Sequence, residues 1–460
     1  MAHGYDPDVQ GIVYSGYRTS HEATYLLLEV RSAAGAREWL RELAAKVRFG
    51  REQIHHSNVN VALSALALHK LGVSQAAIES FSPAFQEGIH SARRSLILDD
   101  VGQSSPQNWL WGGERAPAQI ALLVFSPDAA THTRERSAEQ ARAERFGLSV
   151  AHELAATSLP QRDEDLREPF GFADGLSQPV IAGTPDGEKL SSAGRTLHVV
   201  APGEILLGHR NVYGELTSVP WLSNPQRAPR FGVNGSYFVL RQLRQDVAGF
   251  WKYFGDQAKG DPAQKQRLAA KAIGRWRNGA PLALYPEGAP PRFSRDAEND
   301  FSYRAADPLG DGCPLGSHVR RGNPRDSKAG DPDQVLKQTN AHRILRRGRT
   351  YGPRAADPAS ASADGHERGL LFACLNANIE RQFEFVHHSW LGNPSFLGLH
   401  EEGDPLIAAD ADPAGRFTIP GMPLRERLTG VPRFVSVVGG GYFFLPGRRG
   451  LFELAGSDAP

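Results

Sequence analysis

The sequence predicts an α+β protein built from two ferredoxin-like sandwich halves with antiparallel sheets. Strand-like apolar runs alternate with helical segments early in the chain, and a comparable set recurs later. Strands and helices that alternate at these lengths are typical of an α+β sandwich of ferredoxin-like type. We place the boundary near residues 198–208, which divides the chain into residues 1–200 and 201–460.

In the first half, strands and helices are expected in alternation. We expect strands over residues 11–17 and 24–32, helices over 36–47 and 58–72, a buried strand over 117–128 and an arginine-rich helix over 134–147. The helix over 58–72 is predicted from the helical spacing of its apolar residues and from Gly72 at its end.

In the second half, a strand leads into a helix twice, and a final strand closes the set. These segments are residues 235–254, 369–390 and 436–446. Between the first two lies a long irregular region, residues 281–366, which is rich in Pro, Gly, Asp and Arg. Irregular stretches of this length inside a compact chain are usually functional or disordered.

Composition excludes several classes of protein. The net charge is +1, so neither a nucleic acid nor a membrane surface is an expected partner. The two cysteines, Cys313 and Cys374, are too few for a disulfide framework or a cysteine-based zinc site. The chain begins without a secretory leader and lacks the ~18 consecutive apolar residues that span a bilayer. We therefore expect a soluble, cytoplasmic protein.

Two short segments hold residues with chemical potential. GFADG, residues 171–175, holds Asp174 between glycines. Asp-Gly pairs are common in turns, so this pair alone indicates only a turn. SHVRRGNPR, residues 317–325, contains His318. A neutral imidazole is a good iron ligand, but this segment alone also fits a surface histidine in a basic turn.

A third segment, ILRRGRTYG at residues 344–352, places arginines beside an apolar pair. Such an arginine is either an edge residue with a buried stem or a fixed charge that points inward. Together the three segments supply an acid, an iron-ligating histidine and an inward arginine, which heterolysis of a peroxide bond on haem requires. The acid moves a proton between the peroxide oxygens, and the guanidinium stabilises charge on the departing oxygen.

These segments resemble those of the dye-decolorizing peroxidases. GFADG matches the GxxDG motif of the family, SHVRRGNPR is similar to its proximal-histidine segment, and ILRRGRTYG is similar to its distal-arginine segment. The likeness extends along most of the chain, for example over FQEGIHSARRSLILDD, GEILLGHRNVYGE and IERQFEFVHHSW. The missing export signal and the long C-terminal half resemble the larger cytoplasmic members of the family.

The resemblance implies one haem b (iron protoporphyrin IX) per chain, bound mainly in the C-terminal half between a distal and a proximal face. It makes Asp174 the distal acid–base catalyst, Arg346 its partner and His318 the axial ligand of the iron. We choose Arg346 rather than Arg347 because of its position relative to the turn that follows.

The resemblance also indicates residues with supporting roles. Arg325, with Arg320 as the second choice, is a candidate partner for a haem propionate. Leu370 and Phe372 are candidates for the apolar lining of the distal pocket, and both also fit plain strand core.

Two further roles remain open between candidates. Members of the family hold the axial histidine with a carboxylate or a carbonyl, for which Asp404 is the first candidate and Glu384 the second. Each also fits a solvated loop or helix face. Trp390 and Tyr351 are candidate surface aromatics that relay electrons from bulky donors, and both also fit ordinary packed aromatics.

We therefore expect a haem peroxidase that reduces hydrogen peroxide and oxidises bulky aromatic donors such as dyes and phenols, through Asp/Arg-assisted heterolysis to a ferryl intermediate. The alternative is a haem-binding, iron-releasing protein with little peroxidase turnover, which would need neither Asp174 nor Arg346. The sequence leaves homo-oligomer formation and an encapsulating partner open.

Overall fold

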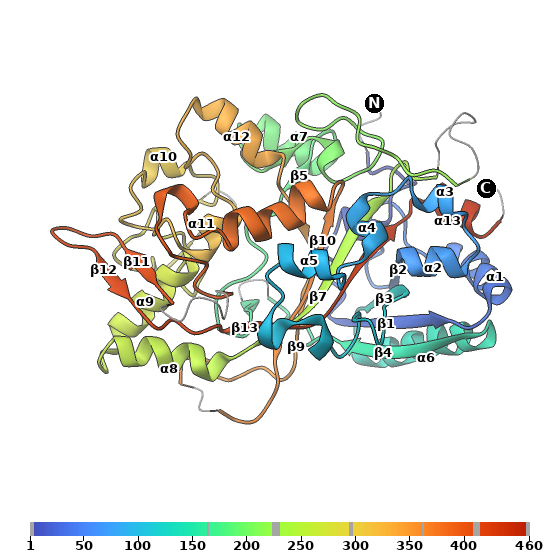
Figure 1. Ribbon diagram of the computed structural model, residues 1–460, viewed down its shortest axis with the longest axis horizontal. Coiled ribbons are helices and arrows are strands. Elements are labelled where there is room, and N and C mark those ends of the chain that lie inside the picture. The colour runs from blue at the N-terminus through green and yellow to red at the C-terminus, as the bar shows by residue number, and fades with distance from the viewer. Residues whose placement is uncertain are drawn as a thin grey trace.

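The largest element of the protein is one nine-stranded sheet. Its strands follow the order β4-β1-β3-β2-β13-β7-β10-β8, and β9 also pairs with β10. The computed structural model describes residues 4–162, 165–222, 231–293, 298–360, 363–407 and 415–456. In Figure 1, α1, α2, α6 and strands β1–β4 of the first half lie on the right, α8 to α12 of the second half lie on the left, and α13 lies on the right near α1.

The first half has the ferredoxin-like strand order. Its strands β4, β1, β3 and β2 are antiparallel neighbours in that order, and α1 and α6 each follow a strand. The bounds are β1 Glu22–Val30, α1 Ala33–Ala44, β2 Asn58–Leu63, β3 Ile120–Ser126, α6 Ala129–Arg145 and β4 Leu148–Ala155. This is the β-α-β-β-α-β pattern of the predicted fold class.

The second half repeats the same order with β13, β7, β10 and β8. The bounds are β7 Ser236–Gln245, α8 Val247–Gln257, α9 Pro262–Ile273, β8 Leu345–Arg346, β9 Arg349–Tyr351, β10 Gly369–Asn376 and β13 Val435–Leu445. After β10 the chain forms π-helical turns over Glu380–Glu384 and Val386–Leu391. Because Phe444 of β13 also pairs with Leu63 of β2, the two antiparallel sheets are joined into one.

Shorter elements connect and cover these units. In the first half they are α2 Ala65–Lys70, α3 Gln75–Ile78, α4 Pro83–Glu87, α5 Ala92–Ile97, β5 Val180–Ile181, α7 Pro185–Ser192 and β6 Val199–Val200. In the second half they are α10 Tyr303–Ala306, α11 His318–Gly322, α12 Pro332–Asn340, β11 Phe417–Ile419, β12 Glu426–Leu428 and α13 Arg448–Leu454. None of the helices in the described ranges is long and apolar enough to cross a membrane.

Two local predictions were wrong. The helix expected over 58–72 is strand β2 followed by the short helix α2, because Ser64 caps α2 by accepting from the N–H of Ala67 (3.2 Å). The strand expected over 11–17 contains instead a single 3₁₀ turn, Gly11–Val13. The domain boundary after residue 200 falls directly after β6, and it stays a prediction because one sheet runs through both halves.

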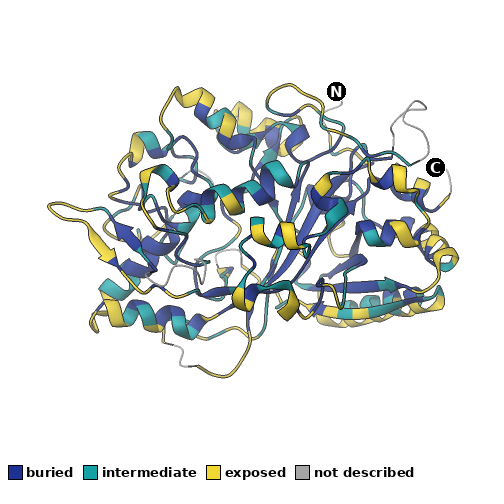
Figure 2. Cartoon of the chain, in the orientation of Figure 1, coloured by how far each residue is buried: buried dark blue, intermediate teal, exposed yellow. Residues whose placement is uncertain are grey.

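Hydrophobic cores cover both faces of the sheet in the first half. Alternate residues of β1, such as Leu26 and Leu27, belong to two different buried clusters. In Figure 2 the central strands are buried, whereas helices such as α6 expose their outer faces. A third cluster packs α8 and α9 against Phe170 and Phe172, which brings the segment before Asp174 onto the second half.

Candidate active site

A cavity of about 760 Å³ lies against the strands of the second half. Side chains alternate between the faces of a strand, so Leu243 and Gln245 of β7 both line the cavity, as do Leu370 and Phe372 of β10. Cofactor and ligand pockets typically measure roughly 300–1,000 Å³. The structure therefore has room for a cofactor at the wall that contains Leu370 and Phe372.

Three residues from distant segments share this cavity. Asp174 comes from the turn before β5, His318 begins α11 and Arg346 lies on β8. The long region expected to be irregular supplies two of them, because it contains α11 and β8. The acid, the imidazole and the guanidinium are thus brought together by the tertiary fold.

The turn that carries Asp174 depends on two glycines. Gly171 has a φ of 96° and Gly175 a φ of 77°, values at which glycine is favoured because it lacks a Cβ. The N–H of Asp174 donates to the carbonyl of Leu166 (3.3 Å). The GFADG segment is therefore a tight turn, and its single carboxylate lies on the cavity wall.

His318 is oriented by Asp404. Nδ1 of His318 donates to Oδ2 of Asp404 (2.9 Å), and Oδ1 of Asp404 accepts from the N–H of Leu406 (2.9 Å). Burial alone would lower the pKa of His318, but the charge and hydrogen bond of Asp404 outweigh it, so the pKa is raised. With its proton on Nδ1, a neutral His318 carries its lone pair on Nε2, the atom that can bind a metal.

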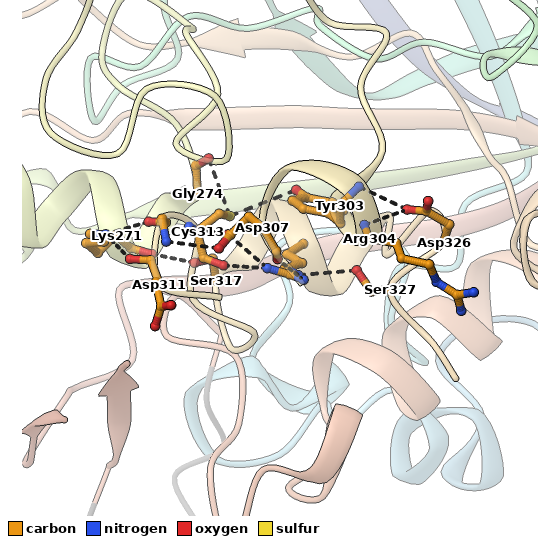
Figure 3. Close-up of polar contacts among 12 residues, drawn as sticks. Lys271, Gly274, Tyr303, Arg304, Asp307, Asp311, Cys313, Ser317, Asp326 and Ser327 are labelled. Carbon is orange, nitrogen blue, oxygen red and sulfur yellow. Dashed lines mark hydrogen bonds and ion pairs between the residues drawn. The ribbon is translucent and has the colours of Figure 1, made fainter. Parts of the chain in front are cut away.

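A buried polar network, shown in Figure 3, holds the loop before His318. Ser317 donates from Oγ to the carbonyl of Lys271 (2.5 Å). Arg320 donates to the carbonyl of Cys313 (2.7 Å), pairs with Asp307 (3.2 Å) and lies over the ring of Tyr303. These contacts fix the start of α11 and with it the position of His318.

The predicted role of Arg320 as a propionate partner does not fit this position. Its side chain is fully buried and is not part of the cavity wall. Asp307 already neutralises its charge. Arg320 instead braces the helix that carries His318.

Arg346 is tied to the segment that follows Asp174. Its backbone N–H donates to Oε1 of Gln178 (3.1 Å), and its Nη2 donates to the carbonyl of Leu176 (2.8 Å). Among the described residues, the hydrogen bond of its guanidinium goes to an uncharged carbonyl and not to a carboxylate. Residues 174–178 therefore contain both the distal acid and the two groups that bond Arg346.

The side chain of Arg347 forms hydrogen bonds with the N-terminal segment. Its Nε donates to the carbonyl of Ile12 (2.7 Å), and its Nη2 donates to the carbonyl of Val13 (2.8 Å). Burial lowers its pKa to about 10. Arg347 thus fastens the N-terminal segment to β8, which distinguishes it from its neighbour Arg346.

Buried arginines gather around Ser177 beside the cavity. Arg275 donates to Oγ of Ser177 (3.0 Å), Arg343 to the carbonyl of Ser177 (2.9 Å) and Arg325 to the carbonyl of Asn299 (2.9 Å). Among the described residues, the hydrogen bonds of these three arginines all go to uncharged oxygens. Burial, together with the neighbouring guanidinium groups, lowers the pKa of Arg275 to about 10 and that of Arg343 to about 9.

A cluster of this kind favours an anionic ligand, because buried charges are stable only when they are paired. Arg275 and Ser177 form part of the cavity wall, whereas Arg325 lies behind Ser177 and Asn299. The carboxylates of a cofactor would therefore meet Arg275 first, with Arg325 adding charge from behind.

Glu384 is not the partner of His318. Its carboxylate pairs with Arg94 (2.8 Å) and accepts from the hydroxyl of Tyr442 (2.8 Å). The sequence could not distinguish Glu384 from Asp404 as the partner of His318, because only tertiary packing brings Asp404 to His318.

The two candidate relay residues differ in exposure. Trp390 is 2% exposed and packs against His342 and Phe385, so the expectation that it is a surface aromatic is wrong. Tyr351 is half-buried, and its hydroxyl donates to Oε1 of Glu367 (3.1 Å).

The polar residues of the cavity wall that sequence reasoning missed include Glu168, His198, Arg275 and His387. Burial and neighbouring arginines lower the pKa of both His198 and His387 to about 3, so both imidazoles are neutral. Glu168 stands just before GFADG and His387 lies in the quoted segment IERQFEFVHHSW, so both could have been found. His198 and Arg275 stand in no recognisable motif.

Two ferredoxin-like units thus share one sheet, and its cavity gathers Asp174, His318 and Arg346. Solved structures share this fold. A DyP-type peroxidase from Anabaena has a TM-score of 0.80 at 22% identity over 98% of this chain and 97% of its own. A fungal DyP-type peroxidase from Auricularia auricula-judae has a TM-score of 0.77 at 23% identity, with 98% of each chain covered.

Curated relatives place the chain in a family. A multifunctional dye peroxidase from Amycolatopsis is 29% identical over 92% of this chain and 90% of the relative. A dye-decolorizing peroxidase from Mycetinis scorodonius is 29% identical over 84% of this chain and 74% of the relative. A deferrochelatase from Yersinia pestis matches only 50% of this chain, at 27% identity.

A scan of protein-family models gives no match. The relatives nevertheless cover most of the chain, and they agree with the fold. The curated relatives over most of the chain, and its structural neighbours, are DyP-type dye-decolorizing peroxidases.

Proposed function

We propose that this protein is a haem peroxidase that reduces hydrogen peroxide and oxidises aromatic donors, including bulky dyes and phenols. The observation that carries the proposal is the single cavity shared by Asp174, Arg346 and His318, in a chain whose curated relatives are dye peroxidases.

The residues around the cavity fit one haem b. Leu370 and Phe372 offer an apolar wall to a flat macrocycle, and Nε2 of His318 is the ligand atom for its iron. Arg275 offers hydrogen bonds and charge to propionate groups, and Arg325 adds charge behind it. Haem supplies an iron centre that cleaves the oxygen–oxygen bond and stores two oxidising equivalents.

The chain's own residues handle the proton and the charge. Asp174 takes a proton from hydrogen peroxide on its carboxylate and returns it to the departing oxygen. Arg346 lies beside the same turn and stabilises the negative charge that develops on that oxygen. Asp404 accepts the hydrogen bond of His318 Nδ1, which fixes the ring and makes Nε2 a stronger donor.

Donors too large for the cavity would pass their electrons to a surface aromatic, which relays them into the protein. Tyr351 fits this role because it is partly exposed and because Glu367 can accept its phenolic proton on oxidation. The expected cytoplasmic location and the oligomeric state remain predictions.

Peroxide turnover and haem binding can be separated by experiment. Purified protein loaded with haem should show a Soret band that shifts when hydrogen peroxide is added, and it should oxidise a phenol and an anthraquinone dye. Haem-loaded Asp174→Asn should retain the Soret band and lose most of the turnover. A protein that binds haem, releases iron and oxidises neither donor would be a haem-handling protein instead.

A further inference from the structure

Glu168 lines the cavity, and the catalytic roles proposed above do not use it. Its Oε1 accepts from the N–H of Phe172 (2.9 Å), and its Oε2 accepts from the N–H of Phe170 (2.9 Å). Oε2 also accepts from Nε2 of Gln245 (2.8 Å), a residue at the end of β7. One carboxylate therefore occupies the backbone N–H groups on both sides of Gly171 and links them to the sheet.

The loop closed by Glu168 leads straight into the catalytic turn. The N–H of Glu168 donates to the carbonyl of Phe172 (3.0 Å), so the loop is closed by backbone as well as side chain. The next residue, Ala173, donates its N–H to the carbonyl of Arg277 (3.0 Å). A shift of Phe172 is therefore passed through one residue to Asp174.

Other contacts hold the aromatic side chains of this loop but leave its N–H groups to Glu168. Nε1 of Trp251 donates to the carbonyl of Phe170 (3.0 Å), and the rings of Phe172 and Trp251 are stacked 6.1 Å apart. Packing thus sets where the loop lies, and the carboxylate sets the orientation of its peptide groups.

We propose that Glu168 is a positioning residue for Asp174, and that its carboxylate holds the turn in the orientation that places the acid on the cavity wall. The proposal rests on the proposed role of Asp174. The contacts that carry it belong to the chain itself, so they can be tested in the haem-free protein.

The charge state of Glu168 gives a second readout. Burial raises its pKa, the three hydrogen bonds lower it and the charge of Asp174 raises it, with a net pKa of about 7. The charged or titratable groups that interact with it are Asp174 in its own turn and His318 across the cavity. A protonated carboxyl accepts fewer N–H bonds than a carboxylate, so the turn is held less firmly below neutral pH.

Amide hydrogen exchange in the haem-free protein tests the contacts directly. Glu168→Gln leaves one acceptor oxygen for two backbone N–H groups, so at least one of the Phe170 and Phe172 amides should exchange about tenfold faster. The matched control is Glu188→Gln, an exposed residue of α7, in which exchange of these amides should not change. Unchanged exchange in Glu168→Gln would overturn the proposal.

Peroxide kinetics in the haem-loaded protein test the consequence. Glu168→Gln should keep its haem content and react with peroxide roughly 10–100-fold more slowly, since small misplacements of catalytic groups have effects of that size. Its rate should lose any change near pH 7 that the parent shows, and Glu168→Asp should recover part of the rate because it keeps the charge. Equal rates and pH profiles in parent and Gln variant would overturn the positioning role.

The amide-exchange and peroxide experiments also distinguish failure of this proposal from failure of the proposed function. A parent protein without any peroxide reaction would refute the peroxidase assignment, whereas faster amide exchange in Glu168→Gln would still show that the carboxylate orders the turn.

Discussion

Strands β1 and β7 occupy equivalent positions in the two ferredoxin-like halves. The side chains of β1 form hydrophobic core, whereas part of β7 lines the candidate active site. In β1, neighbouring residues such as Leu26 and Leu27 enter hydrophobic cores on opposite faces. Strand β7 begins the same way, with Val239 and Leu240 in those two cores. From Arg241 onward, alternate side chains of β7, namely Arg241, Leu243 and Gln245, line the cavity.

The difference lies in where the connecting segments go. In the first half, α1 and α6 return to the sheet and cover it, whereas α8 and α9 turn away from β7 to form a hydrophobic cluster of their own (Figure 1). The sheet face left open becomes the cavity wall. The same strand order can therefore serve stability in one half and ligand binding in the other, as is common for widely used folds.

The strongest test of this division is the loss of the cavity's metal ligand. His318→Ala should abolish haem retention, because Asp404 cannot replace Nε2 of His318 as the ligand of the iron. The fold of both halves should persist. Haem content and circular dichroism measure the two effects. His400→Ala, at an exposed position, is the control, and a His318→Ala protein with full haem and an unchanged iron spectrum would remove His318 from the site.

A second test compares two adjacent arginines, Arg346 at the end of β8 and Arg347 directly after it. Arg346→Leu should slow the reaction with peroxide by ~10²–10³-fold, the usual effect of removing a preorganised charge donor. Arg347→Leu should change that rate far less, because Arg347 bonds to Ile12 and Val13, and should loosen the N-terminal segment instead. Stopped-flow mixing and limited proteolysis measure these outcomes, and equal rate losses would contradict the assignment.

A third test compares truncations in β1 and β7. Leu26→Ala opens a void in a closed core and should lower the free energy of unfolding by about 2–5 kcal/mol. Leu243→Ala faces a cavity that already exists, so it should cost about 1 kcal/mol. Urea unfolding of the haem-free proteins gives both values. Similar losses would mean that the wall of the cavity is packed as tightly as the core.

A fourth test uses the pH dependence of stability. The pKa of Glu168 is about 7 in the folded protein and 4.5 in its ordinary state, so the folded chain binds this proton more tightly. Burial penalises the charged form, so protonation of Glu168 stabilises the fold overall, although the neutral group accepts fewer N–H bonds from the turn. This stabilisation is complete below pH 4.5 and is lost as the pH rises to about 7. The loss is on the order of 3 kcal/mol. The unfolding free energy of Glu168→Gln should lack this part of the slope.

The smallest expected effect concerns the relay. Tyr351→Phe should lower turnover of bulky dyes a few-fold and leave the peroxide step unchanged, because only electron transfer from the surface-bound donor is affected. Trp390→Phe should change dye turnover less, since Trp390 is buried. Steady-state rates with one bulky dye and one small phenol decide between them, and the reverse order would restore Trp390 as the relay.

The sequence predicted the fold class and the chemical types of the site because both are encoded locally. Strand and helix periodicities are visible in short windows, and Asp174, His318 and Arg346 each stand in a recognisable segment. The helix predicted over residues 58–72 was wrong because Val59 and Val61 fit a buried strand as well as a helix. Only the pairing with β3 decides that these residues form a strand.

The rest of the site could not be predicted because tertiary packing assembles it. Arg275 reaches Ser177 from the end of α9 without any motif around it. Arg320 and Arg325 look alike in the sequence, but one is neutralised by Asp307 and the other lies behind Asn299. Burial depth and partner choice are properties of the folded chain.

The pairing of β13 with β2 has a consequence for the growing chain. Strand β13 lies in the interior of the sheet, between β2 and β7, although it is synthesised after every other strand of that sheet. Until residues 435–445 leave the ribosome, β2 and β7 each present an unpaired edge, which is a site for wrong strand pairing. Ribosome-bound chains that stop before β13 should therefore need chaperone protection, and cooperative closure of the sheet should wait until β13 has been synthesised.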